Sequence, residues 1–188
     1  MGKNLLCEEC GLEKATDISS EDNRRLCSYC NKREQVARKS FVNMRYHLRL
    51  SLVREYPFIN HFYIEDDDRE KLVIPIRCGD GWYELIKDMC DEIKAYLQDN
   101  PEKTEKFKIE NISEKYGELR VCFRGVDIET EKEIDKIVLY YDKLSKKICE
   151  ECGCPGVLRE KESGWLKTLC NDCVKKNKFK KYIYIAKE

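Results

Sequence analysis

The sequence predicts an α+β protein, in which a central antiparallel β-sheet with two amphipathic helices is flanked by two four-cysteine modules. Three observations predict it. Pairs of the form C-x2-C recur at both ends of the 188-residue chain. The middle holds two stretches of alternating apolar residues, each interrupted by a turn. It also holds two segments whose apolar residues recur every three or four positions, as on one face of a helix.

The terminal pairs have the spacing of zinc ligands. Sixteen residues separate the two pairs near the N-terminus and seventeen separate those near the C-terminus, and both modules open with Cys-Glu-Glu-Cys-Gly. Four thiolates at such spacings form closed, structural Zn²⁺ sites with no open position for substrate. We therefore expect two structural zinc sites, with these ligands: Cys7, Cys10, Cys27, Cys30, Cys149, Cys152, Cys170 and Cys173.

Each module is expected to fold as a treble-clef or ribbon-like finger. Gly153 follows the second knuckle, where the tight turn favours positive φ. A hairpin is expected over 156–161 and 165–169, and a helix-compatible segment follows each second pair. Cys154 adjoins the knuckle and competes with Cys152 as a ligand, but the repeat favours Cys152.

A long basic helix is expected from about residue 27 to residue 56. Its apolar stripe includes Met44, Leu48 and Leu52, and Pro57 ends it. Nine Lys or Arg and one acid lie between positions 24 and 54. Three of these cations share one helix face, and further lysines follow the last cysteine pair. The expected phosphate contacts are Arg38, Arg45, Arg49, Lys175, Lys176, Lys178 and Lys180.

The middle of the chain is expected to form two hairpin-plus-helix units. The first has strands over 61–64 and 71–76 around an acidic turn, Asp80 as helix cap, and a stripe from Trp82 to Leu97. The second has strands over 107–112 and 118–124, followed by a helix that a capping box at Thr130 and Glu133 opens. Four parts result: a finger over 1–36, the basic helix and linker over 37–60, the α+β core over 61–148, and a finger with a basic tail over 149–188.

The three cysteines between the modules and the two tryptophans have expected roles as well. Cys90 and Cys122 are expected to be small core residues, and Cys78 a half-buried cysteine rather than a reactive thiol. Trp82 and Trp165 each follow a glycine, and either core packing or stacking on a partner suits them.

Composition narrows the function classes. Lys plus Arg and Asp plus Glu both number 36, so the net charge is zero, which excludes a uniformly basic coat but not local patches. No apolar run approaches about 20 residues and the N-terminus has no signal-peptide core, so no membrane span and a cytoplasmic location are expected.

Three segments resemble parts of small, uncharacterised zinc-finger proteins encoded in phage and prophage genomes. They are Gly79-Asp80-Gly81-Trp82, Glu114-Lys115-Tyr116-Gly117 with the strand after it, and the second cysteine module from Cys149 to Cys170. The resemblance covers roughly residues 72–175. It implies a mobile-element origin in a bacterial host and one shared fold, without a mechanism.

Catalytic motifs are not evident. The chain has no phosphate loop, no G-x-G-x-x-G and no H-E-x-x-H, and His47 is poorly placed for a nuclease base. Asp80 with Glu118 faintly resembles a carboxylate nuclease centre. Two hypotheses carry more weight: a non-enzymatic protein that binds nucleic acid, or a protein-binding inhibitor or modulator of a host or defence protein. No small-molecule substrate is indicated.

Overall fold

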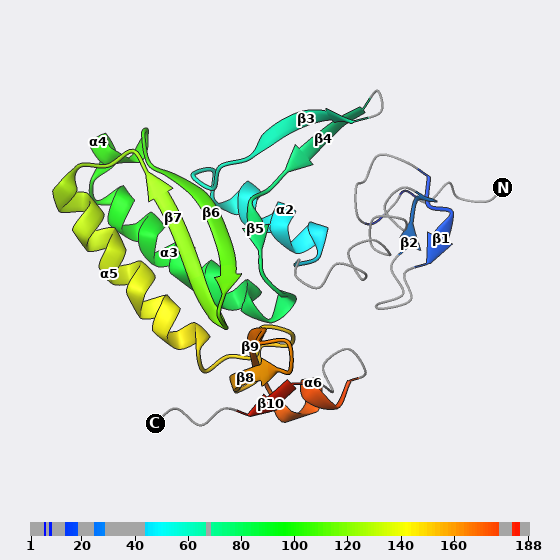
Figure 1. Cartoon of the computed structure of the whole chain (residues 1–188). Helices are drawn as coiled ribbons and strands as arrows, with labels where there is room; N and C mark the ends of the chain where they lie inside the picture. Colours follow the sequence, from blue (N-terminus) through cyan, green and yellow to red (C-terminus); the bar gives the residue numbers. More distant parts are fainter. Residues whose placement is uncertain are drawn as a thin grey trace.

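The structure is a computed structural model that describes residues 6, 8, 14–18, 25–28, 44–66, 69–176 and 182–184 (Figure 1). Within these residues it is an α+β fold, as predicted. A three-stranded sheet and the helices packed on it form the core, and a separate cysteine module follows at the lower end in Figure 1.

The central sheet has the order β5-β6-β7, with β5 at Ile76–Arg77, β6 at Lys108–Lys115 and β7 at Glu118–Arg124. β6 and β7 form the predicted antiparallel hairpin, with a register shift between Ile109 and Asn111. The prediction of a wholly antiparallel sheet is wrong, because β5 pairs with β6 in parallel. A helix crosses between these two strands, and such a crossover returns the chain in the same direction.

The first predicted hairpin forms but stands apart from this sheet. β3 (Phe62–Asp66) and β4 (Arg69–Val73) pair only with each other among the described strands. Pro75 lies between β4 and β5, as expected of a residue without a backbone N–H to donate to a sheet. The predicted strand over 71–76 is therefore two strands.

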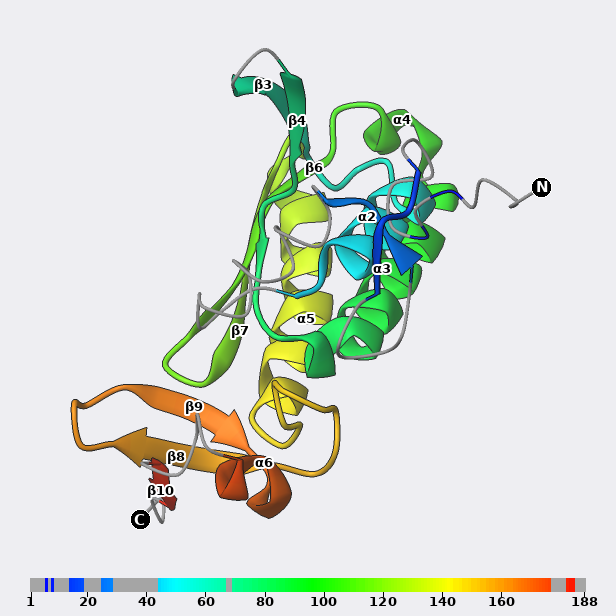
Figure 2. The ribbon, with the colours of Figure 1, turned by 90° about the vertical axis from the view of Figure 1, so that its right-hand side faces the viewer.

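Two helices cover one face of the central sheet (Figure 2). They are α3 (Tyr83–Gln98), which the 3₁₀ turn η1 (Asp80–Trp82) precedes, and α5 (Ile128–Ser145); α4 (Pro101–Thr104) lies between α3 and β6. Their apolar stripes are buried as predicted. The fully buried side chains of this core include Trp82, Ile86, Met89, Ile93, Phe107, Ile109, Ile112 and Ile134.

The long basic helix is not continuous. Helix α2 spans Tyr46–Glu55, and Arg45 before it has an extended backbone with ψ 142°. The N–H of Met44 donates to the carbonyl of Cys78 at 2.5 Å, and the N–H of Arg45 donates to Asp80 Oδ1 at 2.7 Å. These tertiary bonds replace the helical ones that the periodicity predicts. The stretch 29–43 lies outside the described residues.

Both predicted helix caps are wrong. Asp80 accepts hydrogen bonds from Arg45 instead of capping α3. Helix α5 begins earlier than the predicted box, because Asp127 Oδ1 accepts the N–H of Thr130 at 2.9 Å and Thr130 itself is buried within the helix. An aspartate at this position is among the best N-caps.

Of the three cysteines between the modules, only Cys90 lies where it was predicted. Cys90 is fully buried in the core, and Cys78 is buried completely rather than by half. Burial, reinforced by the negative charge of Glu150, raises the pKa of the Cys78 thiol well above its usual value, so it is no reactive thiolate. Cys122 is exposed, which contradicts the prediction of a core residue.

The C-terminal module contains the predicted hairpin and more. β8 (Val157–Lys161) pairs with β9 (Leu166–Leu169), and β10 (Tyr182–Tyr184) adds to the outer edge of β8. The short helix α6 spans Asn171–Lys175. Near the N-terminus β1 (Asp17–Ile18) pairs with β2 (Arg25–Leu26). Among the described helices, none is long and apolar enough to cross a membrane.

Candidate metal centre and its junction with the core

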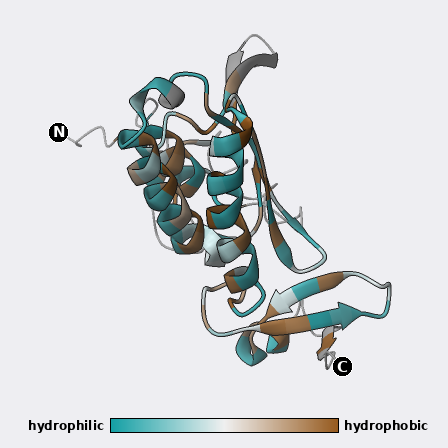
Figure 3. Cartoon of the chain, turned by 90° about the vertical axis from the view of Figure 1, so that its left-hand side faces the viewer, coloured by the Kyte–Doolittle hydropathy of each residue, from teal (hydrophilic) through white to brown (hydrophobic). Residues whose placement is uncertain are grey.

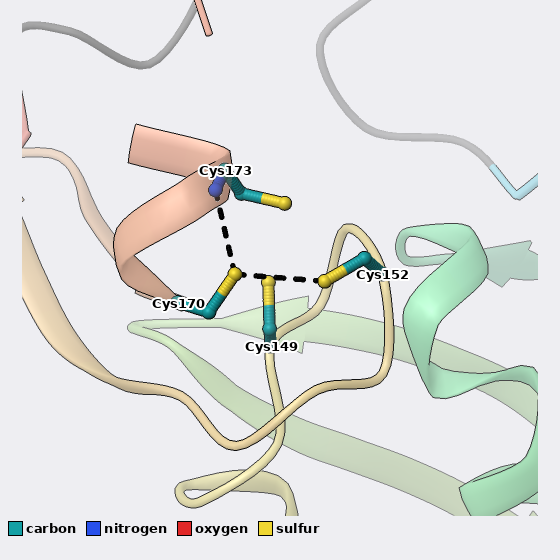
Figure 4. Close-up of side chains that lie close together, drawn as sticks. All are labelled: Cys149, Cys152, Cys170 and Cys173. Atoms are coloured by element: carbon teal, nitrogen blue, oxygen red, sulfur yellow. Dashed lines mark hydrogen bonds between the residues drawn. The ribbon is translucent and has the colours of Figure 1, made fainter. Parts of the chain in front are cut away.

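Four cysteines of the C-terminal module converge on one point (Figure 4). The sulfurs of Cys149, Cys152, Cys170 and Cys173 all lie within 4.8 Å of one another, and those of Cys152 and Cys170 are 3.6 Å apart. In a tetrahedral Zn²⁺ site with bonds of about 2.3 Å the sulfurs stand about 3.8 Å apart. The donor set and its spacing therefore fit a metal ion bound by four thiolates. In the described chain this is the one group of three or more metal-ligating side chains that lie together.

The knuckle loop places the first two sulfurs. The N–H of Cys149 donates to the carbonyl of Cys154 at 2.7 Å, and the N–H of Gly153 donates back to the carbonyl of Cys149 at 2.8 Å. Gly153 has φ +78°, as the sequence predicts for this turn. Cys154 belongs to the loop through its backbone, while its exposed side chain is outside the cluster. Cys152, and not Cys154, thus belongs to the cluster that could hold a metal ion.

Helix α6 places the other two sulfurs. Cys170 is the N-cap of this helix, and its sulfur accepts the N–H of Cys173 at 3.4 Å. Burial raises the pKa of Cys170, but the N–H of Cys173 and the neighbouring thiols outweigh it and lower that pKa to about 7. Burial raises the pKa of Cys149 to about 11. A bound cation would stabilise all four thiolates, and no open coordination position would remain.

The N-terminal module shares backbone features with this one. The N–H of Glu8 donates to the carbonyl of Arg25, just as the N–H of Glu150 donates to the carbonyl of Thr168, at the equivalent positions of the repeat. Leu26 of the first module and Leu169 of the second are both fully buried and both paired in a hairpin.

Cys27, which follows that leucine, is buried as well. The predicted ligands Cys7, Cys10 and Cys30 lie outside the described residues. What the two modules share is therefore the backbone framework around the second cysteine pair.

A glycine loop of the core fits against the knuckle. The N–H of Gly81 donates to the carbonyl of Glu150 at 2.8 Å, and the N–H of Gly79 donates to its carboxylate at 2.8 Å. A Cβ added at Gly81 would overlap the carbonyl of Cys149 and the amide of Cys152. Only glycine permits this approach, because any side chain would push the module away.

The carboxylate of Glu150 lies at the centre of the junction. It is fully buried, and Lys167 Nζ, also buried, is 3.2 Å from it. Burial raises the pKa of Glu150 to about 7; Lys167 opposes that rise and the nearby Glu114 adds to it. Both partners belong to the cysteine module, so it is the hydrogen bond from the N–H of Gly79 that ties this carboxylate to the core.

Two more hydrogen bonds complete the junction. Thr168 Oγ1 donates to the carbonyl of Gly117, in the turn between β6 and β7, at 2.7 Å. Trp82 Nε1 donates to the carbonyl of Ile148 at 2.9 Å. Trp82 is fully buried, so of its two predicted roles the core role is the one observed, whereas Trp165 is 55% exposed.

All three motif segments of the sequence meet at this junction. The glycine loop, the turn of the β6–β7 hairpin and the cysteine module are far apart in the chain but touch one another here. Sequence reasoning assigned no role to Glu150, Lys167 or Thr168. The only sign of them in the sequence was their position within the motif segments, next to the cysteines of the cluster.

The predicted nucleic-acid contacts divide into three groups. Arg45 forms an ion pair with Asp80 at 2.5 Å, and the guanidinium of Arg49 lies over the ring of Tyr46 at 5.8 Å; both arginines are half-buried. Their observed contacts are thus within the protein. Lys175 and Lys176 are exposed on and after α6. The remaining three, Arg38, Lys178 and Lys180, lie outside the described residues.

The carboxylates of the nuclease hypothesis have cationic partners. Asp80 pairs with Arg45, and Glu118 pairs with Arg120 at 2.6 Å and Lys146 at 2.8 Å. Burial raises the pKa of Glu118, but these cations outweigh it, so that pKa is lowered. Neither carboxylate belongs to a metal-ligating group among the described residues.

Comparison of the chain with protein-family models, with curated proteins and with solved structures finds no match.

Proposed function

We propose that this chain is a zinc-binding accessory protein that binds nucleic acid without catalysing a reaction. The observation that carries the proposal is the cluster of four thiolates, which suits a closed structural zinc site. A metal held in this way stabilises a small module. The function then depends on the side chains that the module and the core expose to partners. The shared backbone framework of the N-terminal module supports a second zinc ion there, bound by its four cysteines.

The cations next to the metal centre support the choice of nucleic acid. The side chain of Lys175 is 77% exposed, and Lys176 follows it directly. Lys175 pairs with Asp172 at 3.1 Å, but a surface pair of this kind contributes at most about 1 kcal/mol and would yield to a phosphate. The likeness of the motifs to phage and prophage proteins fits an accessory role in a bacterial cytoplasm.

The test begins with the zinc content of the purified chain, measured by elemental analysis, which we expect to be two per chain. An electrophoretic shift on DNA and RNA across a salt series follows, and we expect binding that weakens steeply with salt. The double variant Lys175→Gln/Lys176→Gln should bind more weakly. A matched control, Lys106→Gln/Lys115→Gln, removes two exposed lysines elsewhere. Absence of any shift by the zinc-loaded chain would refute the proposal.

One observation favours a second candidate, a protein-binding inhibitor or modulator. Trp165, in the turn between β8 and β9, exposes 55% of its surface, and aromatic residues are enriched where proteins meet. Capture of one partner in stoichiometric amount by the wild-type chain, lost in Trp165→Ala, would support this candidate over the first.

A further inference from the structure

We infer that the outward face of α5 binds single-stranded nucleic acid, with its lysines on the phosphates and Tyr140 against a base. This inference rests on the proposed function and names the surface and the form of nucleic acid. The face, here called the lysine stripe, is defined by five residues of α5 and one just after it: Lys132, Lys136, Leu139, Tyr140, Lys143 and Lys147.

The helix geometry places the five side chains that belong to α5 together. At about 100° per residue they fall within about 100° of the helix circumference. The buried residues of α5, among them Ile134, Val138 and Ser145, lie on the opposite side and pack into the core. The stripe therefore faces directly away from the core. Figure 3 shows this side of α5, mostly hydrophilic, running down to the cysteine module.

The charges of the stripe are available to a partner. All four lysines, at 132, 136, 143 and 147, are exposed. Lys136 forms a surface pair with Glu133 at 2.6 Å while its side chain stays 69% exposed. Between Lys132 and Lys143 the stripe spans about 16 Å along the helix axis, and Lys147 follows in the turn after the helix. A row of cations of this length suits an extended polyanion.

Acidic residues gather on the neighbouring helix. Glu84, Asp88, Asp91 and Glu92 of α3 are all exposed, and α3 packs beside α5 (Figure 2). Asp88 and Glu92 are close enough to Tyr141 of α5 to help burial raise the pKa of that tyrosine to about 12. A strand bound to the stripe would be repelled by these carboxylates, and the exposed Glu129, Glu131 and Asp135 of α5 itself also lie beside the lysines.

Two large apolar side chains in the middle of the stripe favour a single strand. Leu139 and Tyr140 are each 54% exposed. The ring of Tyr140 meets that of Tyr141 edge to face, with centroids 5.2 Å apart, which fixes its orientation. Exposed rings among cations are the surface on which unpaired bases stack, whereas a duplex keeps its bases stacked inside.

The test is fluorescence anisotropy of a labelled 15-nucleotide thymidine strand and a matched 15-base-pair duplex with the zinc-loaded full chain. The quadruple variant Lys132→Gln/Lys136→Gln/Lys143→Gln/Lys147→Gln should bind the strand at least about tenfold more weakly. Its salt slope should fall by about 3, or about 0.7 for each lost phosphate contact. Tyr140→Ala should weaken strand binding by about tenfold. Glutamine keeps the helix propensity of lysine, so α5 should fold normally.

The controls separate this inference from the proposed function. Lys106→Gln/Lys115→Gln should bind as the wild-type chain does. If Lys175→Gln/Lys176→Gln loses affinity and the quadruple variant does not, the chain still binds nucleic acid, but the inference that the lysine stripe binds it is overturned. Tighter binding to the duplex, or an unchanged affinity in Tyr140→Ala, overturns the single-strand assignment. If the wild-type chain binds neither probe, both proposals fail.

Discussion

The two cysteine modules share a framework but use the same face of it differently. In the C-terminal module the glutamate after the first cysteine, Glu150, is fully buried and binds the glycine loop of the core. In the N-terminal module the equivalent Glu8 is exposed and forms an ion pair with Arg25. The residue whose carbonyl accepts the N–H of this glutamate differs too: it is Arg25 in the first module and Thr168 in the second, where Thr168 is buried and donates to Gly117 of the core. A repeated module thus becomes a docked one when two positions lose access to water and gain hydrogen-bonding partners.

The largest expected effect is that of metal removal. Binding of structural zinc contributes about 10 kcal/mol or more to the folding of such modules, so chelation should unfold the C-terminal one. The change should reach the core, because Trp82 donates to the carbonyl of Ile148, which directly precedes Cys149. In a Trp165→Phe background Trp82 is the single tryptophan, and its emission should shift to the red when zinc is withdrawn or in Cys149→Ser.

The same background tests the other module. Cys27→Ser should leave the emission of Trp82 unchanged while lowering the zinc content by one. A red shift in Cys27→Ser as large as that in Cys149→Ser would show that both modules are coupled to the core alike.

The next effect concerns the glycine loop. Gly81→Ala inserts a Cβ where the backbone of the knuckle lies, and overpacking of this kind costs about 1–3 kcal/mol. We expect the junction to open, seen as faster hydrogen exchange at the amides of Gly79 and Gly81 and at Trp82 Nε1. The zinc content should stay at the wild-type value.

Gly164→Ala is the matched control for this variant. Gly164 has a positive φ like that of Gly153, but nothing lies within 4 Å of an added Cβ. It should lower stability through backbone strain alone and leave the exchange at the junction slow. Equal exchange rates in the two variants would mean that the close approach does not hold the module.

The sequence predicted the parts of this structure that local spacing determines. The clustering of the four C-terminal cysteines, the β8–β9 hairpin and the positive φ of Gly153 all follow from residues within one short segment. The stripes of α3 and α5 follow from helical periodicity. These features need no knowledge of what packs against them.

What the sequence did not reveal depends on long-range contacts. The break before α2 follows from Asp80, thirty-five positions away, which binds both the backbone and the guanidinium of Arg45. The burial of Glu150 follows from the glycine loop 71 positions earlier. Charged residues are expected at the surface, so Arg45 was predicted to contact phosphate and Glu150 was given no role. The C-x2-C pairs located the cysteine cluster but not the face on which the module docks.

A smaller effect should follow from the loss of one hydrogen bond at the junction. Thr168→Val keeps the shape of the side chain but leaves the buried carbonyl of Gly117 without its donor, which costs about 1–3 kcal/mol. Chemical denaturation of the zinc-loaded chain, followed through Trp82 in the Trp165→Phe background, should show this loss. An unchanged midpoint would mean that water replaces the hydroxyl and that the junction is more open than its geometry indicates.

The smallest effect is expected at the equivalent place in the N-terminal module. Glu8→Gln removes the charge from a pair in which Glu8 is 36% and Arg25 45% exposed, and surface pairs of this kind contribute at most about 1 kcal/mol. The carboxamide oxygen still accepts the backbone N–H of Arg25, which Glu8 accepts at 2.7 Å in the wild type. Denaturation at low and high salt should show a difference of less than about 1 kcal/mol that shrinks as salt screens the pair. A loss as large as that of Thr168→Val would mean that this face is also buried against something, and that the two modules dock in the same way.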